Sequence, residues 1–142
     1  MKQRSNGQRG GAMLELTLFA PWIFFIFAGA LDLGYYTYAL ISVENAARVA
    51  SLYTSTSTST VSDGTTACTY AMGELKSLPN VRSLSNCDSS TLRVTAQAQN
   101  GSDGSAASLV SVTYQSLPLI PIPGLLQGQF TWRRSVIMRL RG

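Results

Sequence analysis

An apolar run that starts directly after two glycines constrains this chain more than any other feature. Gly10 and Gly11 precede the run, Glu15 lies near its beginning, and no charged residue occurs from Leu16 to Leu31. An ionised side chain inside hydrocarbon costs roughly 2.5–3.5 kcal/mol on insertion scales, so an acid at this position indicates a function. The alternative is that Glu15 lies at the membrane edge, where its carboxylate remains hydrated.

The residues that flank the run predict a membrane helix and its orientation. Residues 1–10 contain Lys2, Arg4 and Arg9 and no acid, a pattern that keeps an N-terminus in the cytoplasm and sends the following chain across the membrane. The apolar character continues past Asp32, and Tyr35, Tyr36 and Tyr38 resemble an interfacial aromatic belt. We expect the span at about residues 14–38. Asp32 lies either at the outer interface or against a neighbouring helix.

The helix is expected to continue beyond the membrane and to occupy residues 11–53. Pro21 should kink it without breaking it, because neighbouring groups in a membrane satisfy the freed carbonyl. After residue 40, apolar residues recur at helical intervals, and Glu44 and Arg48 are spaced for an i,i+4 ion pair. Such a helix would be about 60 Å long. The residues expected on its apolar face are Ile41, Ala46, Ala47, Val49, Ala50 and Tyr53.

The remaining chain predicts a small α+β domain. Residues 54–67 form a Ser/Thr-rich linker, and residues 68–142 form the C-terminal domain. The pattern predicts a short helix over 69–78 and an antiparallel sheet of three to four strands, with strands at 92–98, 109–117 and 130–140. The proline-rich residues 117–126 are expected to form a hydrophobic crossing loop. The fold class is therefore α+β, with a long N-terminal transmembrane helix followed by this small domain.

Composition excludes several classes of function. The chain has no histidine and two cysteines, so we predict no metal site, no cofactor and no catalytic residues. Of its net charge of +4, most comes from the first ten residues, which makes nucleic acid an improbable partner. Outside the cytoplasm, Cys68 and Cys87 are expected to form a structural disulfide.

The N-terminal residues resemble the processing site of type IV pilin-like proteins. The similarity is greatest to the TadE-like minor pilins, or pseudopilins, of tight-adherence (Flp) pili. It rests on Arg9-Gly10-Gly11-Ala12-Met13-Leu14-Glu15 and the apolar residues up to Pro21, and further on Asp32-Leu33-Gly34-Tyr35-Tyr36, Asn45-Ala46-Ala47-Arg48 and the terminal Ser135–Arg139.

This resemblance implies a processing step and a set of partners. In such families a membrane prepilin peptidase cuts after a glycine on the cytoplasmic side and leaves glutamate as the fifth residue. Cleavage after Gly10 makes Gly11 the first residue and Glu15 the fifth, whereas cleavage after Gly11 would make Glu15 the fourth. Gly10 is therefore the expected cleavage glycine. The new α-amino group would be paired with Glu15 of the same or a neighbouring subunit.

The resemblance also implies a localisation and a role. The chain would be an inner-membrane protein with a cytoplasmic N-terminus and an outer C-terminal domain, and would then enter a pilus used for surface attachment. Its partners would be the peptidase, other pilin subunits and the assembly machinery. A length of 142 residues favours a minor, accessory or tip subunit over a very small major subunit.

Two other readings of the same segment stay open at this point. Ala28-Gly29-Ala30 resembles an Ala-x-Ala signal-peptidase site, and cleavage after Ala30 would release a soluble secreted domain. Alternatively, the apolar run is an uncleaved signal anchor that holds an envelope domain at the membrane.

Overall fold

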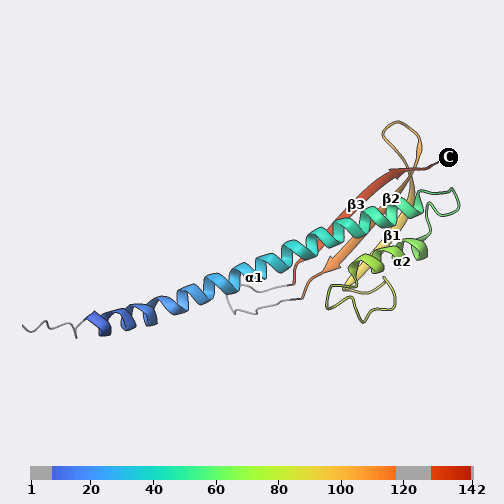
Figure 1. Cartoon of the computed structure of the whole chain (residues 1–142). Coiled ribbons are helices and arrows are strands. Elements are labelled where there is room, and N and C mark those ends of the chain that lie inside the picture. The colour runs from blue at the N-terminus through green and yellow to red at the C-terminus, as the bar shows by residue number, and fades with distance from the viewer. Residues whose placement is uncertain (1–7, 118–128, 142) are drawn as a thin grey trace, which may run out of the picture. The chain divides into compact units, whose positions relative to one another are not determined.

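The computed structural model describes residues 8–117 and 129–141, with side chains from Gly11 onward (Figure 1). The chain divides into two compact units, residues 1–35 and residues 36–142. The α+β class predicted from the sequence is confirmed, with three antiparallel strands. The elements in chain order are α1 (Gln8–Thr54), α2 (Gly64–Leu75), β1 (Leu92–Asn100), β2 (Ala106–Gln115) and β3 (Thr131–Arg139).

The first unit contains the apolar part of α1. This 47-residue helix continues through Pro21 without a break, while the kink expected there stays a prediction. From Gly11 to Thr54 it is long and apolar enough to cross a membrane, with a mean hydropathy of 1.9 over its most apolar stretch, none of which is buried in the molecule. A helix that is apolar around its whole circumference needs either lipid or other helices around it.

The second unit is built on a three-stranded antiparallel meander with the strand order β1-β2-β3. Paired residues on the three strands form rows across the sheet. One row is Leu92, Tyr114 and Trp132, and the next on the same face is Val94, Val112 and Arg134. The β1–β2 turn closes with a hydrogen bond from Gly101 N to Ser105 O at 2.7 Å. Gly104 adopts φ 77° in this turn, a conformation that favours glycine. The predicted hydrophobic loop at 117–126 lies outside the described residues, apart from Leu117.

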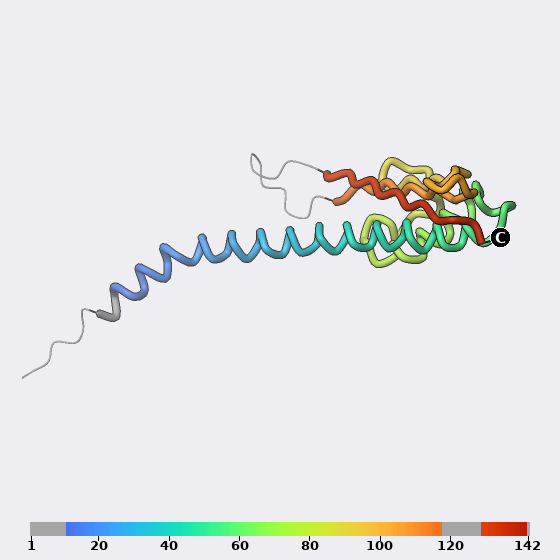
Figure 2. Tube along the Cα trace, turned by 90° about the horizontal axis from the view of Figure 1, so that it is seen from above, coloured from blue at the N-terminus to red at the C-terminus, as the bar shows by residue number. Residues whose placement is uncertain are grey.

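One face of the sheet packs against the C-terminal part of α1 and against α2. The core residues from the strands are Leu92, Val94, Val110, Val112 and Tyr114. This confirms the prediction that Val110, Val112 and Tyr114 lie on one buried face of β2. The α1 residues in this core are mostly alanines, and β3 runs alongside this part of α1 (Figure 2). The helical core residues are Ala39, Val43, Ala46, Ala47 and Ala50 of α1 and Ala67, Ala71 and Leu75 of α2.

The packed face of α1 differs from the predicted one at Ile41, Val49 and Tyr53, of which Val49 is half-buried and lies outside the core. Ile41 and Tyr53 are 62% and 42% exposed, whereas Ala39 and Val43 are fully buried. Residues 39, 43, 46, 47 and 50 follow the 3.6-residue period, and position 41 points away from that stripe. The strong hydrophobicity of Ile41 and Tyr53 misled the prediction, because the position of the sheet decides which stripe of the helix is covered. The predicted Glu44–Arg48 ion pair is present at 3.1 Å.

α2 begins five residues before the predicted start at Thr69. Asp63 has the extended conformation of a helix N-cap, and its Oδ1 accepts hydrogen bonds from Thr65 N at 2.9 Å and Thr66 N at 3.2 Å. These bonds satisfy donors that the first helical turn leaves unpaired. An aspartate followed by glycine and threonines is a recognisable cap signal, but the surrounding Ser/Thr-rich composition concealed it.

Candidate functional site: the N-terminal segment of α1

The structure places Gly10, Gly11, Glu15 and Pro21 in the first turns of α1. At Gly11 an added Cβ would meet no described atom within 4 Å. Nothing in the described part of this chain therefore requires a glycine at position 11. Glu15 follows Gly11 by four residues, so the two positions lie one above the other on the helix.

Glu15 lies on the exposed surface of the helix among large apolar side chains. Met13, Leu14 and Leu16 around it are 72%, 74% and 64% exposed. No described residue forms an ion pair with its carboxylate. The described part of this unit thus exposes the Glu15 carboxylate on an apolar surface. In lipid or among other helices, the negative charge of Glu15 would have neither water nor a cation beside it. The same surface continues with Leu18, Phe19, Trp22, Ile23, Phe24, Phe25, Ile26 and Phe27.

Local hydrogen bonding supports bending of the helix near Pro21. Proline lacks the donor that would bond to the carbonyl of Thr17, four residues earlier. The Thr17 hydroxyl in turn donates to Met13 O at 2.8 Å, and such back-bonding by threonine bends helices. The sequence analysis predicted a kink at Pro21 but did not consider Thr17. Thr17 could have been found from the sequence, because it lies four residues before Pro21 and its carbonyl is the one that loses a donor.

A second acid in this unit is buried. Asp32 is 3% exposed, and its Oδ1 has no hydrogen-bond donor among the described residues. A buried carboxyl oxygen without a donor is costly.

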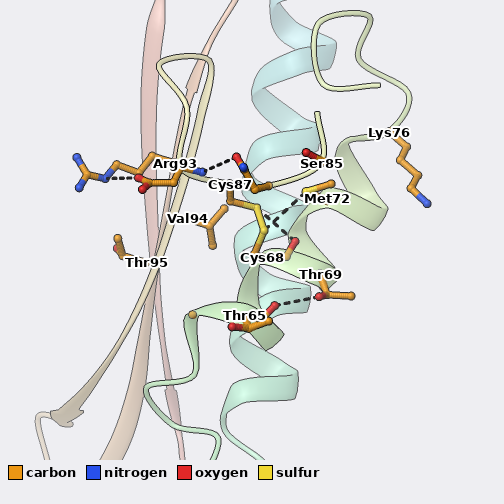
Figure 3. A pocket seen from close by; sticks show the side chains of 13 residues that line it. Thr65, Cys68, Thr69, Met72, Lys76, Ser85, Cys87, Arg93, Val94 and Thr95 are labelled. Carbon is orange, nitrogen blue, oxygen red and sulfur yellow. Dashed lines mark hydrogen bonds and ion pairs between the residues drawn. A yellow bond between two sulfur atoms is a disulfide. The ribbon is translucent and has the colours of Figure 1, made fainter. Parts of the chain in front are cut away.

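The cysteines lie in the second unit, apart from this segment in the sequence. Cys68 of α2 and Cys87 form a disulfide with an S–S distance of 2.05 Å. The bridge forms part of the wall of an open cleft of about 550 Å³ between α2 and β1. Met72 and Val94 add apolar surface, and Lys76 and Arg93 extend from opposite sides (Figure 3).

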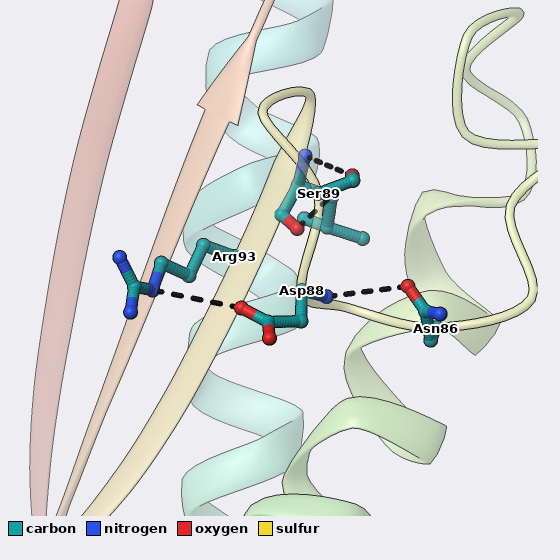
Figure 4. Close-up of polar contacts among 5 residues, drawn as sticks. Asn86, Asp88, Ser89 and Arg93 are labelled. Carbon is teal, nitrogen blue, oxygen red and sulfur yellow. Dashed lines mark hydrogen bonds and ion pairs between the residues drawn. The ribbon is translucent and has the colours of Figure 1, made fainter.

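The cleft offers no set of groups suited to catalysis within the described residues. Its acid, Asp88, lies 4.0 Å from Arg93, and both side chains are largely exposed (Figure 4). No group of three or more His, Cys, Asp or Glu residues in the described ranges is arranged to hold a metal. The N-terminal segment therefore remains the stronger candidate site.

The described chain combines a long apolar N-terminal helix, which carries a glycine pair and an acid near its start, with a small α+β domain, an arrangement that suggests a membrane anchor. The sequence comparison is more specific: residues 10–51 match the family model described as TadE-like protein. The TadE-like resemblance is thereby confirmed for this segment, and the match indicates a protein associated with a Tad pilus. TadE-like proteins are structural, pilus-associated proteins and not an enzyme family. Comparisons with curated proteins and with solved structures gave no significant match.

The family match covers the residues from Gly10 to the end of the packed part of α1. It includes Gly11, Glu15 and Pro21, and it stops before Cys68 and the sheet. Together with the apolar helix, this match indicates a membrane anchor and a place at the cell surface. The pilus machinery and other pilus subunits follow as the general class of partners.

Proposed function

We propose that this chain is a TadE-like prepilin, cut after Gly10 by a prepilin peptidase and assembled into or at the tip of a tight-adherence pilus used for surface attachment. On this proposal residues 1–10 are the leader and residues 11–53 the assembly helix, with a span at about 14–38. The linker predicted at residues 54–67 ends at Asp63, because residues 64–67 form the first turn of α2, and the pilin domain predicted at residues 68–142 therefore begins at Gly64 and faces outward. Before assembly the chain is stored in the inner membrane.

The observation that carries this proposal is Glu15 on an exposed apolar helix, one turn after Gly11. Cleavage after Gly10 would create an α-amino cation at Gly11. In a bundle of apolar helices this cation and the Glu15 carboxylate would both lose water, and each would then need the other. The pair could form within one subunit or between neighbours. No described residue offers Glu15 another cation.

The basic leader supports the proposed orientation. Lys2, Arg4 and Arg9 precede the apolar run, and the short segment contains no acid. The positive-inside bias keeps such a segment in the cytoplasm and places the second unit on the other side. A folded domain with a disulfide fits a compartment outside the reducing cytoplasm.

The first test is the N-terminal sequence and intact mass of the chain recovered from its native envelope. A mature chain that begins at Gly11 supports prepilin processing. A start at Leu31 would instead identify a secreted domain released after Ala30, and an intact Met1 in cells with an active peptidase would identify a signal anchor. Either of those results overturns the proposed processing.

The second test removes the Glu15 charge. The variant Glu15→Gln should remain membrane-bound and processed, but its amount in sheared pili should fall roughly 100-fold or more, because an uncompensated buried charge costs at least about 3 kcal/mol. Glu44→Gln is the matched control on the same helix, since Glu44 is an exposed acid paired with Arg48. Normal incorporation of Glu15→Gln would contradict the proposed role of this carboxylate.

A further inference from the structure

One end of the second unit carries a cluster of aromatic rings. The ring of Tyr36, the first residue of this unit, lies 5.0 Å from that of Phe130 and 5.8 Å from that of Trp132, centroid to centroid. Trp132 also stacks on Tyr114 at 6.2 Å. Phe130 remains 48% exposed. This end therefore presents aromatic surface to its surroundings.

Basic side chains from three separate segments gather at the same end. Arg133 lies next to Trp132 and is aligned through Thr113 with Arg93 of β1, and Arg134 follows on β3. The other two, Lys76 and Arg82, lie in the segment that follows α2. All five of these basic side chains are exposed.

Hydrogen bonds fix the segment after α2 at this end. Ser77, next to Lys76, accepts a hydrogen bond from the Tyr38 hydroxyl at 2.8 Å. Asn80, two residues before Arg82, accepts one from the Tyr114 hydroxyl at 2.6 Å.

The charge of this end is not balanced by acids of the same unit. Asp88 lies 4.0 Å from Arg93 (Figure 4). Glu44 and Arg48 line a hollow together with Arg134, and Glu74 precedes Lys76 by two residues. With Arg48 counted, six basic residues against these three acids give a local charge of +3. At the opposite end, Arg139 lies 3.5 Å from Asp103. Lys76, Arg82, Arg133 and Arg134 have no ion pair within the described part of the chain.

Tyr36 lies on α1 shortly after the uncharged apolar run. Tyr36 follows Leu31, the last residue of the uncharged apolar run, by five residues, which is about 7.5 Å along a helix. The headgroup layer on each side of the hydrocarbon core is roughly 5–7 Å thick. Aromatic rings favour that layer, and arginine side chains extend their charge from it toward phosphate.

We propose that this end of the second unit binds the anionic phospholipid headgroups of the bilayer that holds α1. The residues that would do so lie on both faces of the sheet and in the segments beside it: Tyr36, Phe130, Trp132, Lys76, Arg82, Arg93, Arg133 and Arg134. The domain then rests on the membrane surface while the chain is stored there. This inference rests on insertion of α1 and does not depend on cleavage after Gly10 or on pilus assembly. Lipid is favoured over an acidic protein because this end follows directly on the apolar run and combines rings with cations.

Trp132 offers a direct measurement of this contact. Trp22 and Trp132 are the two tryptophans of the chain, so the full-length variant Trp22→Phe leaves Trp132 as the reporter. The protein is reconstituted into phosphatidylcholine vesicles with or without phosphatidylglycerol. We expect Trp132 to be quenched by lipids brominated near the headgroup, and to be better shielded from aqueous iodide when phosphatidylglycerol is present.

Charge variants locate the effect. Each basic residue near an anionic surface contributes about 1 kcal/mol, so Arg133→Gln with Arg134→Gln should lower the ratio of docked to undocked protein roughly 30-fold. Arg139→Gln with Arg141→Gln removes the same charge from the opposite end of β3 and should leave quenching nearly unchanged. Near-ultraviolet circular dichroism checks that each variant is folded.

The outcomes separate this inference from the proposed anchor. Flotation with the vesicles and resistance to carbonate extraction report insertion of α1, and failure there would contradict the anchor itself. With α1 inserted, equal quenching with and without phosphatidylglycerol overturns the docking inference, as does an equal loss in both pairs of arginine variants. Shielding of Trp132 that requires an added acidic protein instead of lipid would also overturn it.

Discussion

At the scale of single residues, Asp63 determines where α2 begins. Hydrogen bonds to its carboxylate from the Thr66 hydroxyl, and from the backbone N–H groups of Thr66 and Thr65, lower the pKa of Asp63 below its usual value. A carboxyl whose pKa is lower in the folded state stabilises the fold above its unfolded pKa of about 3.9. This contribution is lost as the pH falls from about 4 through the folded pKa.

We therefore expect Asp63→Ala to lower the melting temperature by a few degrees at pH 7, because helix donors lose their acceptor. Asp63→Asn retains a capping oxygen and does not titrate. The difference in melting temperature between wild type and Asp63→Asn should shrink as the pH is lowered below 4, measured by circular dichroism in detergent. If the difference in melting temperature between the two proteins did not change with pH, the Asp63 charge would make no contribution to stability. Asp103, whose pKa is also lowered by bonds to Ser105, is common to both proteins and cancels in the comparison.

At the scale of elements, the disulfide fixes α2 to the segment before β1. α2 buries three apolar side chains, Ala67, Ala71 and Leu75, two of which are small. Cys87 is 6% exposed and belongs to the same core. The bridge joins residues 19 positions apart and supplements this modest packing by restricting the unfolded chain.

Loss of the bridge should lower the free energy of unfolding of the second unit by about 3 kcal/mol, by the loop-closure relation for a ring of this size. Urea unfolding with and without dithiothreitol measures this difference. The double variant Cys68→Ser with Cys87→Ser provides the control, since dithiothreitol should have no effect on it. An unchanged urea midpoint on reduction of the wild type would show that core packing alone holds α2.

At the scale of the whole molecule, the two units have opposite requirements. The apolar part of α1 exposes its large side chains on all sides, whereas residues 36–142 bury a continuous core drawn from both helices and all three strands. A core of this kind is the property that lets a segment fold independently. The first unit, in contrast, needs lipid or other helices.

We expect a fragment of residues 36–142, produced under oxidising conditions, to be soluble and monomeric without detergent and to melt cooperatively. The full-length chain should require detergent or lipid, because the exposed apolar surface from Met13 to Phe27 would otherwise associate. Size-exclusion chromatography with light scattering distinguishes the two behaviours. An insoluble fragment, or a full-length chain that is monomeric without detergent, would contradict this division.

The sequence by itself determined the features that depend on neighbouring residues. The apolar run with Glu15 predicted the exposed helix, and the TadE-like signal in the same residues was confirmed over 10–51. Alternation in residues 92–98 and 109–117 predicted two strands and the buried face of β2, because side chains alternate between the faces of a strand. The i,i+4 spacing predicted the Glu44–Arg48 ion pair, because residues four apart are neighbours on the surface of a helix.

Only the tertiary structure decided the features that depend on contacts between distant segments. Ala39 and Val43 lie on the packed face of α1, whereas Ile41 and Tyr53 are exposed, because the position of the sheet decides which stripe of the helix is covered. The basic residues between Lys76 and Arg134 are scattered along the chain, and the strand register together with the Tyr114–Asn80 hydrogen bond brings them to one end. Local patterns carry no information about such register, so a charged end of this kind emerges only when the chain is folded.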